Sequence, residues 1–211
     1  MTNVEDAAVA DLGDVEDDGL TPAPSRVLPW VLAVGGLVGW VASFVLTLER
    51  LELLKNPNYI PTCTINAVLS CGSVMQSPQA AAFGFPNPLI GVAAFAVVTT
   101  IGVAAVAGVR FPRWFWGGLL LGSAAGTVFV HWLMVQSVYE INALCPYCMV
   151  VWAVTIPIFW YTLLHVVGTS RSRTVREVGT VPVRFHWAVL GLWYLLIAFV
   201  VLERFWINAP S

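Results

Sequence analysis

The sequence predicts an all-α, polytopic membrane protein, built as a four-helix transmembrane bundle with a fifth transmembrane helix. The first observation is composition: 58% of the residues are hydrophobic and 10% are charged, whereas soluble domains carry about 25% charged residues. The second is that the charges leave five long stretches free of Asp, Glu, Lys and Arg. The composition also excludes a disordered chain, and a net charge of −2 argues against nucleic-acid binding.

The first charge-free stretch, 27–48, predicts the first helix. Its 22 residues rise about 1.5 Å each and span about 33 Å, close to a hydrocarbon core of about 30 Å. The second stretch is too long for one helix, and its first part is rich in Asn, Pro, Ser, Cys and Gln. Residues 50–87 are therefore predicted to form a polar loop. The remaining helices are expected at 88–109, 114–138, 146–168 and 186–205.

Three further segments complete the predicted organisation. Residues 1–26 hold seven of the 12 acidic residues, two Gly, two Pro and no basic residue before Arg26, which predicts a disordered cytoplasmic tail. They do not open with a basic n-region, so we expect the first helix to be retained rather than cleaved as a signal peptide. Residues 169–185 are expected to form a basic cytoplasmic loop, and 186–211 the fifth helix with a short outer tail.

The basic residues near the helix ends predict the orientation. Lys and Arg concentrate on the cytoplasmic side of membrane proteins. Seven residues fall on the side of the N-terminus, namely Arg26, Arg110, Arg113, Arg171, Arg173, Arg176 and Arg184, against Arg50, Lys55 and Arg204 on the other. We therefore expect a cytoplasmic N-terminus, an extracytoplasmic C-terminus and an extracytoplasmic loop 50–87.

The four cysteines form two pairs on the predicted outer side, where disulfides persist. Cys63 and Cys71 lie in the loop, and Cys145 and Cys148 open the fourth helix with Pro146 in its first turn. Free N–H groups and the helix dipole stabilise a thiolate at such a position, which favours redox exchange. A bridge within C-x-x-C closes so small a loop that it stabilises a fold little. Two purely structural disulfides nevertheless stay open as an alternative.

Other chemistries fit the sequence less well. A four-cysteine zinc site uses short spacings twice, whereas seven residues separate the loop cysteines, so no metal site is expected. Haem attachment needs His where Met149 follows the second cysteine of the C-x-x-C. Ion-coupled transport usually needs ionisable groups at mid-membrane, but the acidic residues near the helices fall at their edges. His131, inside a helix, is expected to make a helix–helix hydrogen bond.

Four features together resemble the vitamin K epoxide reductase family, in particular its bacterial members. They are a loop pair with seven residues between the cysteines, a serine six residues after the second, an asparagine opening the next helix and a later C-x-x-C. In this sequence these are Cys63 and Cys71, Ser77, Asn87, and Cys145 with Cys148. The resemblance covers about residues 27–168.

The resemblance implies a quinone-dependent thiol-disulfide oxidoreductase of the bacterial inner membrane that supports disulfide bond formation. Cys63 would accept electrons from a thioredoxin-like extracytoplasmic protein, expected to be a separate chain. Cys71 would pass them to Cys145 through a transient disulfide, and Cys148 would form the thiolate adduct that reduces menaquinone or ubiquinone. Such exchange proceeds through mixed disulfides, which suits one mobile and one fixed pair. The expected partners are therefore the thioredoxin-like protein and membrane lipid.

The resemblance also indicates residues around the quinone. It makes the Asn87 amide a donor to a quinone carbonyl, although the residue before Pro88 can also act as a helix N-cap. It places Ser77 near the redox centre, although an exposed turn hydroxyl is equally consistent. Trp152 stands where relatives have a tyrosine that holds the quinone, and packing is its alternative. Met75 either lines the quinone pocket or covers the bundle.

Two alternatives to this function stay open. One is a non-enzymatic five-span membrane protein with two structural disulfides. The other is a carrier that moves reductant outward, which would need cysteines reachable from both sides. Residues 64–83 mix apolar, small and polar side chains, which predicts a half-buried lid or short amphipathic helix over the mouth of the bundle.

Overall fold

The computed structural model describes residues 21, 24–170, 172 and 185–207. Most of the predicted acidic tail 1–26, most of the predicted basic loop 169–185 and the outer tail after 207 lie outside the described residues. Within the described part the chain is helical and contains no strand. Five of its helices are long and apolar enough to cross a membrane. The predicted fold class is therefore confirmed.

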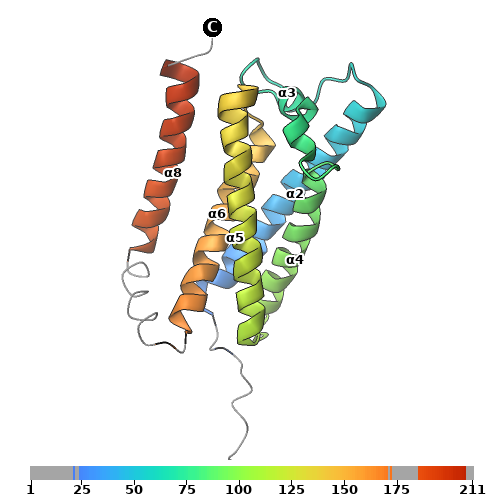
Figure 1. Ribbon diagram of the computed structural model, residues 1–211. Coiled ribbons are helices and arrows are strands. Elements are labelled where there is room, and N and C mark those ends of the chain that lie inside the picture. Colours follow the sequence, from blue (N-terminus) through green and yellow to red (C-terminus); the bar gives the residue numbers. More distant parts are fainter. Residues whose placement is uncertain (1–20, 22–23, 171, 173–184, 208–211) are drawn as a thin grey trace, which may run out of the picture.

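The long helices match the predicted stretches in order (Figure 1). They are α2 (Val27–Lys55), α4 (Pro88–Val106), α5 (Arg113–Val135), α6 (Pro146–Gly168) and α8 (His186–Leu202). Two of them continue into short π-helical turns, η2 (Gln136–Ile141) after α5 and η3 (Glu203–Ile207) after α8. The loop between α2 and α4 contains α3 (Cys71–Gln76) and the 3-10 turn η1 (Pro78–Ala81).

Helix α2 is longer than predicted. It continues through Glu49 to Lys55, so the loop begins at Asn56 rather than at residue 50. The charged residues mark where the helix leaves the apolar layer, but they are good helix formers and do not end it. Asn56 adopts an extended backbone, as the residue before Pro57 prefers, and there the helix stops.

The bundle is assembled around α2, which packs against α4 and α6, while α5 packs against α6. Glycines allow α2 and α4 to approach closely. A Cβ atom at Gly102 of α4 would collide with the backbone of Ala33, and one at Gly36 of α2 would lie 2.8 Å from the Thr99 nitrogen. Small residues of this kind are the usual means of bringing transmembrane helices together. The α4 side of the bundle is thus closely packed against α2.

Helix α8 stands to one side of the other four (Figure 1) and is attached by specific polar contacts. Pro157 of α6 has no N–H, which leaves the carbonyl of Ala153 without its helical partner. The Tyr194 hydroxyl of α8 donates to that carbonyl at 2.6 Å. The Trp193 indole donates to His131 Nε2 of α5 at 3.0 Å, which confirms the expected helix–helix hydrogen bond.

The loop helix α3 lies at the same end of the bundle as the start of α6 and the C-terminal end of α8 (Figure 1). Cys71 and Met75 of α3 are buried, while Ser73 and Gln76 are exposed. This one-sided burial agrees with the short amphipathic helix predicted within 64–83. It brings the cysteines of the loop to the helix end that carries the other two.

Candidate functional site

A short backbone pairing places the loop cysteines beside α6. The N–H of Ser70 donates to the carbonyl of Leu144 at 2.9 Å, and the N–H of Leu144 donates to the carbonyl of Val68 at 2.7 Å. The pairing is parallel. Cys71 follows one segment and Cys145 the other, so their side chains are brought together across 74 positions of sequence.

The loop pair is anchored to α2 by a buried carboxylate. Glu49 accepts hydrogen bonds from the Thr62 hydroxyl at 2.5 Å and from the Thr62 N–H at 3.3 Å. These contacts fix the residue directly before Cys63. Cys63 and Cys71 are joined by a disulfide, and both are buried.

Three sulfur atoms meet at this point. The Sγ of Cys71 lies 3.2 Å from the Sγ of Cys145. Cys145 is a buried free cysteine. The sulfurs of Cys63, Cys71 and Cys145 all lie within 4.8 Å of one another. Although such a cluster has metal-site dimensions, two of its members are bonded to each other and offer no thiolate. The arrangement is suited to thiol-disulfide exchange, in which a thiolate attacks a neighbouring disulfide.

The first turn of α6 lowers the pKa of Cys145. Cys145 is the N-cap residue, and its sulfur accepts the backbone N–H of Cys148 at 3.4 Å. The hydrogen bond from the Cys148 side chain lowers the pKa of Cys145, and the backbone amides of Cys148 and Tyr147 lower it further, against the opposing effect of burial. A thiol with a lowered pKa is more readily a nucleophile or a leaving group.

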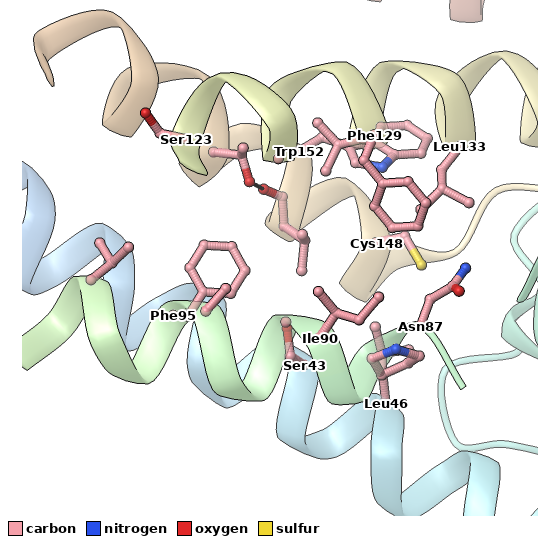
Figure 2. Close-up of a pocket in the computed structure, with 18 of the residues that line it drawn as sticks. Ser43, Leu46, Asn87, Ile90, Phe95, Ser123, Phe129, Leu133, Cys148 and Trp152 are labelled. Carbon is pink, nitrogen blue, oxygen red and sulfur yellow. Dashed lines mark hydrogen bonds between the residues drawn. The ribbon is translucent and has the colours of Figure 1, made fainter. Parts of the chain in front are cut away.

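Cys148 opens onto a cavity of about 540 Å³ between the helices (Figure 2). The cavity is lined chiefly by apolar side chains from α2, α4, α5 and α6. In Figure 2, Cys148, Asn87 and Leu46 lie toward one end, and Ser123 lies away from them. An apolar cleft with a few polar groups at one end is typical of a site for a largely apolar ligand.

The structure brings the four other predicted site residues to this same cavity. Met75, Ser77, Asn87 and Trp152 all line it together with Cys148. Met75 and Trp152 are buried, whereas Ser77 is half-buried and donates its hydroxyl hydrogen to the carbonyl of Val74 at 2.7 Å. The exposed-turn alternative for Ser77 is therefore wrong. What each residue contributes to ligand binding stays a prediction.

Asn87 does not act as a side-chain cap for α4. Its Nδ2 donates to the carbonyl of Gln79 at 2.7 Å, and its Oδ1 accepts the N–H of Ala82 at 3.0 Å. The amide therefore braces the η1 turn, and the capping alternative is wrong. Asn87 itself has helical backbone angles, whereas an N-cap residue usually has extended ones, and both atoms of its amide are engaged by the loop.

Sequence reasoning missed two polar residues of the cavity wall. Arg50 and Gln79 both line the cavity, and each has a buried polar atom without a hydrogen bond to the described residues, Nε of Arg50 and Oε1 of Gln79. A signal for Arg50 was present, because it lies seven residues after Ser43 and four after Leu46, on one face of α2. Gln79 offered none, since its position depends on the fold of the loop.

Comparison with family models gives a match over residues 30–163, to the vitamin K epoxide reductase family. The chain belongs to the vitamin K epoxide reductase family. The matched range holds the four cysteines and nearly all of the helices α2 to α6. A comparison with curated protein sequences gave no match.

Membership identifies the chemistry in general terms. Members of the family are oxidoreductases and in general use a quinone as electron acceptor. The family therefore indicates disulfide-forming redox activity at a membrane. They typically work with thioredoxin-like partners. Together with the five candidate membrane helices, the family indicates a multi-pass membrane protein.

Proposed function

We propose that the protein is a membrane thiol oxidase that carries electrons from a thioredoxin-like extracytoplasmic protein to menaquinone or ubiquinone. The observation that carries the proposal is the 3.2 Å approach of the Cys71 and Cys145 sulfurs. It joins a disulfide in the loop to a C-x-x-C that faces an apolar cavity. On this proposal the N-terminus is cytoplasmic, the C-terminus is extracytoplasmic and the membrane is the bacterial inner membrane.

The exchange steps balance within the chain. A partner dithiol reduces the Cys63–Cys71 disulfide and leaves with a disulfide of its own. The Cys71 thiolate then attacks Cys145 in the oxidised C-x-x-C, which forms a Cys71–Cys145 bond and releases the Cys148 thiolate. Attack of Cys63 on Cys71 restores the loop disulfide and releases Cys145. Two electrons have then moved from the partner to the Cys145–Cys148 pair.

The residues of the cavity fit a quinone. Its walls are chiefly apolar, as an isoprenoid chain requires, and the Asn87 amide lies toward the same end as Cys148, where a carbonyl oxygen of the ring would need a donor. A bound quinone would supply a two-electron, two-proton acceptor for the Cys145–Cys148 dithiol. Trp152 and Met75 would hold the ring by packing, and Asn87 has a second amide hydrogen to donate to a carbonyl oxygen.

The test is anaerobic quinone reduction by the purified protein supplied with a reduced thioredoxin-like C-x-x-C protein. We expect thiol-dependent turnover with ubiquinone-1 or menadione, and its loss in Cys148→Ala. Thermal unfolding of the variant controls for its fold. Absence of turnover with both quinones in a folded wild-type protein would favour a non-enzymatic membrane protein with structural disulfides.

A further inference from the structure

Arg50 is a cation on the wall of the cavity that has no hydrogen bond or ion pair among the residues that the structure describes. Its Nε–H is buried and makes no hydrogen bond. The carboxylate beside it in sequence, Glu49, is already occupied by Thr62. A buried donor without a partner costs free energy, and more so when it carries a charge. Arg50 as a whole is half-buried, and a ligand that supplied an acceptor to this Nε–H would remove the cost.

The neighbours of Arg50 place it at the end of the cavity that holds Cys148. Ser43, Leu46 and Arg50 recur at the spacing of one helical face, and all three line the cavity. Leu46 lies toward the same end of the cavity as Asn87 and Cys148 in Figure 2, and Arg50 follows it by one helical turn. On the proposed orientation this is the outer side, where the positive-inside rule gives no reason for a basic residue.

We propose that Arg50 binds the head group of the quinone, donating a hydrogen bond to a carbonyl oxygen and stabilising negative charge on it as electrons arrive from Cys148. The assignment rests on the proposed function. The overall step forms one S–S bond between Cys145 and Cys148 and moves two electrons and two protons to the quinone, giving the quinol. Guanidinium donors directed at an oxygen that gains charge act most strongly in a water-poor site.

Arg50 and Asn87 would play different roles in binding and reducing the quinone. The Asn87 amide is neutral and partly committed to the η1 turn, so it can orient the ring but not balance charge. Arg50 carries the charge, and its Nε–H has no acceptor among the described residues. We therefore expect Arg50 to contribute more to turnover than to binding of the neutral oxidised quinone.

The experiment compares Arg50→Met and Arg50→Lys with Lys55→Met as the matched control. Lys55 is a cation near the same end of α2, but it is exposed and paired with Glu52. Binding of ubiquinone-1 is measured by quenching of tryptophan fluorescence in a Cys148→Ala background, which cannot turn over. Steady-state turnover is measured with Cys148 intact. Both use nanodiscs of phosphatidylcholine alone and of phosphatidylcholine with phosphatidylglycerol.

We expect Arg50→Met to weaken ubiquinone-1 binding roughly tenfold and to lower kcat roughly 100-fold. Arg50→Lys should recover part of both, because it restores the charge without the planar donor set. Lys55→Met should stay close to wild type. If Arg50→Met does not fold, as judged by thermal unfolding and an intact Cys63–Cys71 disulfide, Arg50→Gln carries the same expectation for kcat.

Three results would overturn the assignment. Wild-type binding and turnover in Arg50→Met would show that the guanidinium does not contact the quinone. Defects confined to nanodiscs with phosphatidylglycerol would show that it binds an anionic lipid head group instead. If the wild-type protein neither binds nor reduces ubiquinone-1 or menadione, the proposed function fails and this assignment fails with it. If the wild-type protein reduces quinone normally and Arg50→Met does so equally well, only the assignment of Arg50 fails and the proposed function stands.

Discussion

The two cysteine pairs are held in place by different kinds of structure. Cys145 and Cys148 lie at the first turn of α6, a helix of 23 residues, and are positioned by its local hydrogen bonds. Cys63 and Cys71 lie in a loop and are positioned by contacts with distant parts of the chain, Glu49 of α2 and Leu144 before α6. The helical pair should therefore tolerate single changes around it, whereas the loop pair should depend on a few anchors.

Removing Cys63 should have the largest effect on the loop pair. Cys63→Ala leaves Cys71 without its loop partner and 3.2 Å from the Cys145 sulfur. We expect a Cys71–Cys145 disulfide to accumulate on oxidation and turnover with the thioredoxin-like substrate to disappear. Mass spectrometry of alkylated, unreduced peptides would identify the bridge. Cys71→Ala is the control and should give no loop-to-α6 disulfide; absence of the bridge in Cys63→Ala would disprove the order of the relay.

Weakening an anchor should have a smaller effect on the loop pair. Glu49→Gln removes the charge that strengthens the two hydrogen bonds from Thr62. We expect a loss of about 1–2 kcal/mol in the free energy of unfolding and a fall in turnover of roughly threefold to tenfold, because Cys63 is held less well. Glu52→Gln is the matched control, since Glu52 is exposed and pairs with Lys55. Equal effects of both changes would contradict a role for the anchor.

The helical pair can be examined by its pH dependence. The hydrogen bond from Cys148 lowers the pKa of Cys145, so its thiolate should persist as the pH falls below the ordinary thiol pKa. Thiolate absorbance at 240 nm, taken as the difference between wild type and Cys145→Ser, should give a midpoint below about 8.5. In a Cys148→Ala background the midpoint should rise. An unchanged midpoint would mean that the helix turn alone sets the acidity of Cys145.

Sequence alone predicts what depends on local pattern. The five helices follow from charge-free stretches, and α6 begins at Pro146 as expected from the C-x-x-C and proline. The spacing of the four cysteines, together with Ser77 and Asn87, indicates the vitamin K epoxide reductase family, and the family match agrees. These features share one property: the residues that reveal them are neighbours along the chain or recur at helical spacing.

What could not be predicted depends on long-range placement. The charges of Glu49 and Arg50 suggested the end of a helix, but α2 continues past them and directs one residue to the loop and the other to the cavity. Asn87 precedes a proline at a helix start, yet its amide braces η1, because the loop folds back onto it. Neither outcome is encoded in spacing, since each needs the three-dimensional path of residues 56–87.

The smallest expected effect concerns a long-range support of the helical pair itself. Asn142, three residues before Cys145, adopts a left-handed backbone and accepts a hydrogen bond from Arg204 of η3 at 2.6 Å. The fifth helix thus braces the turn that leads into the C-x-x-C. Asn142→Gly suits the left-handed backbone and removes only the amide, so it matches Arg204→Met as the other half of a double-mutant cycle.

Each single change should lower the free energy of unfolding by about 1 kcal/mol and turnover by roughly twofold. If the pair acts as one unit, the double variant should lose little more than either single variant. Additive losses would mean that Arg204 stabilises η3 through its other contacts and not through Asn142. A loss of turnover comparable to that of Glu49→Gln would instead show that the helical pair relies on distant anchors as much as the loop pair does, and the distinction between them would not hold.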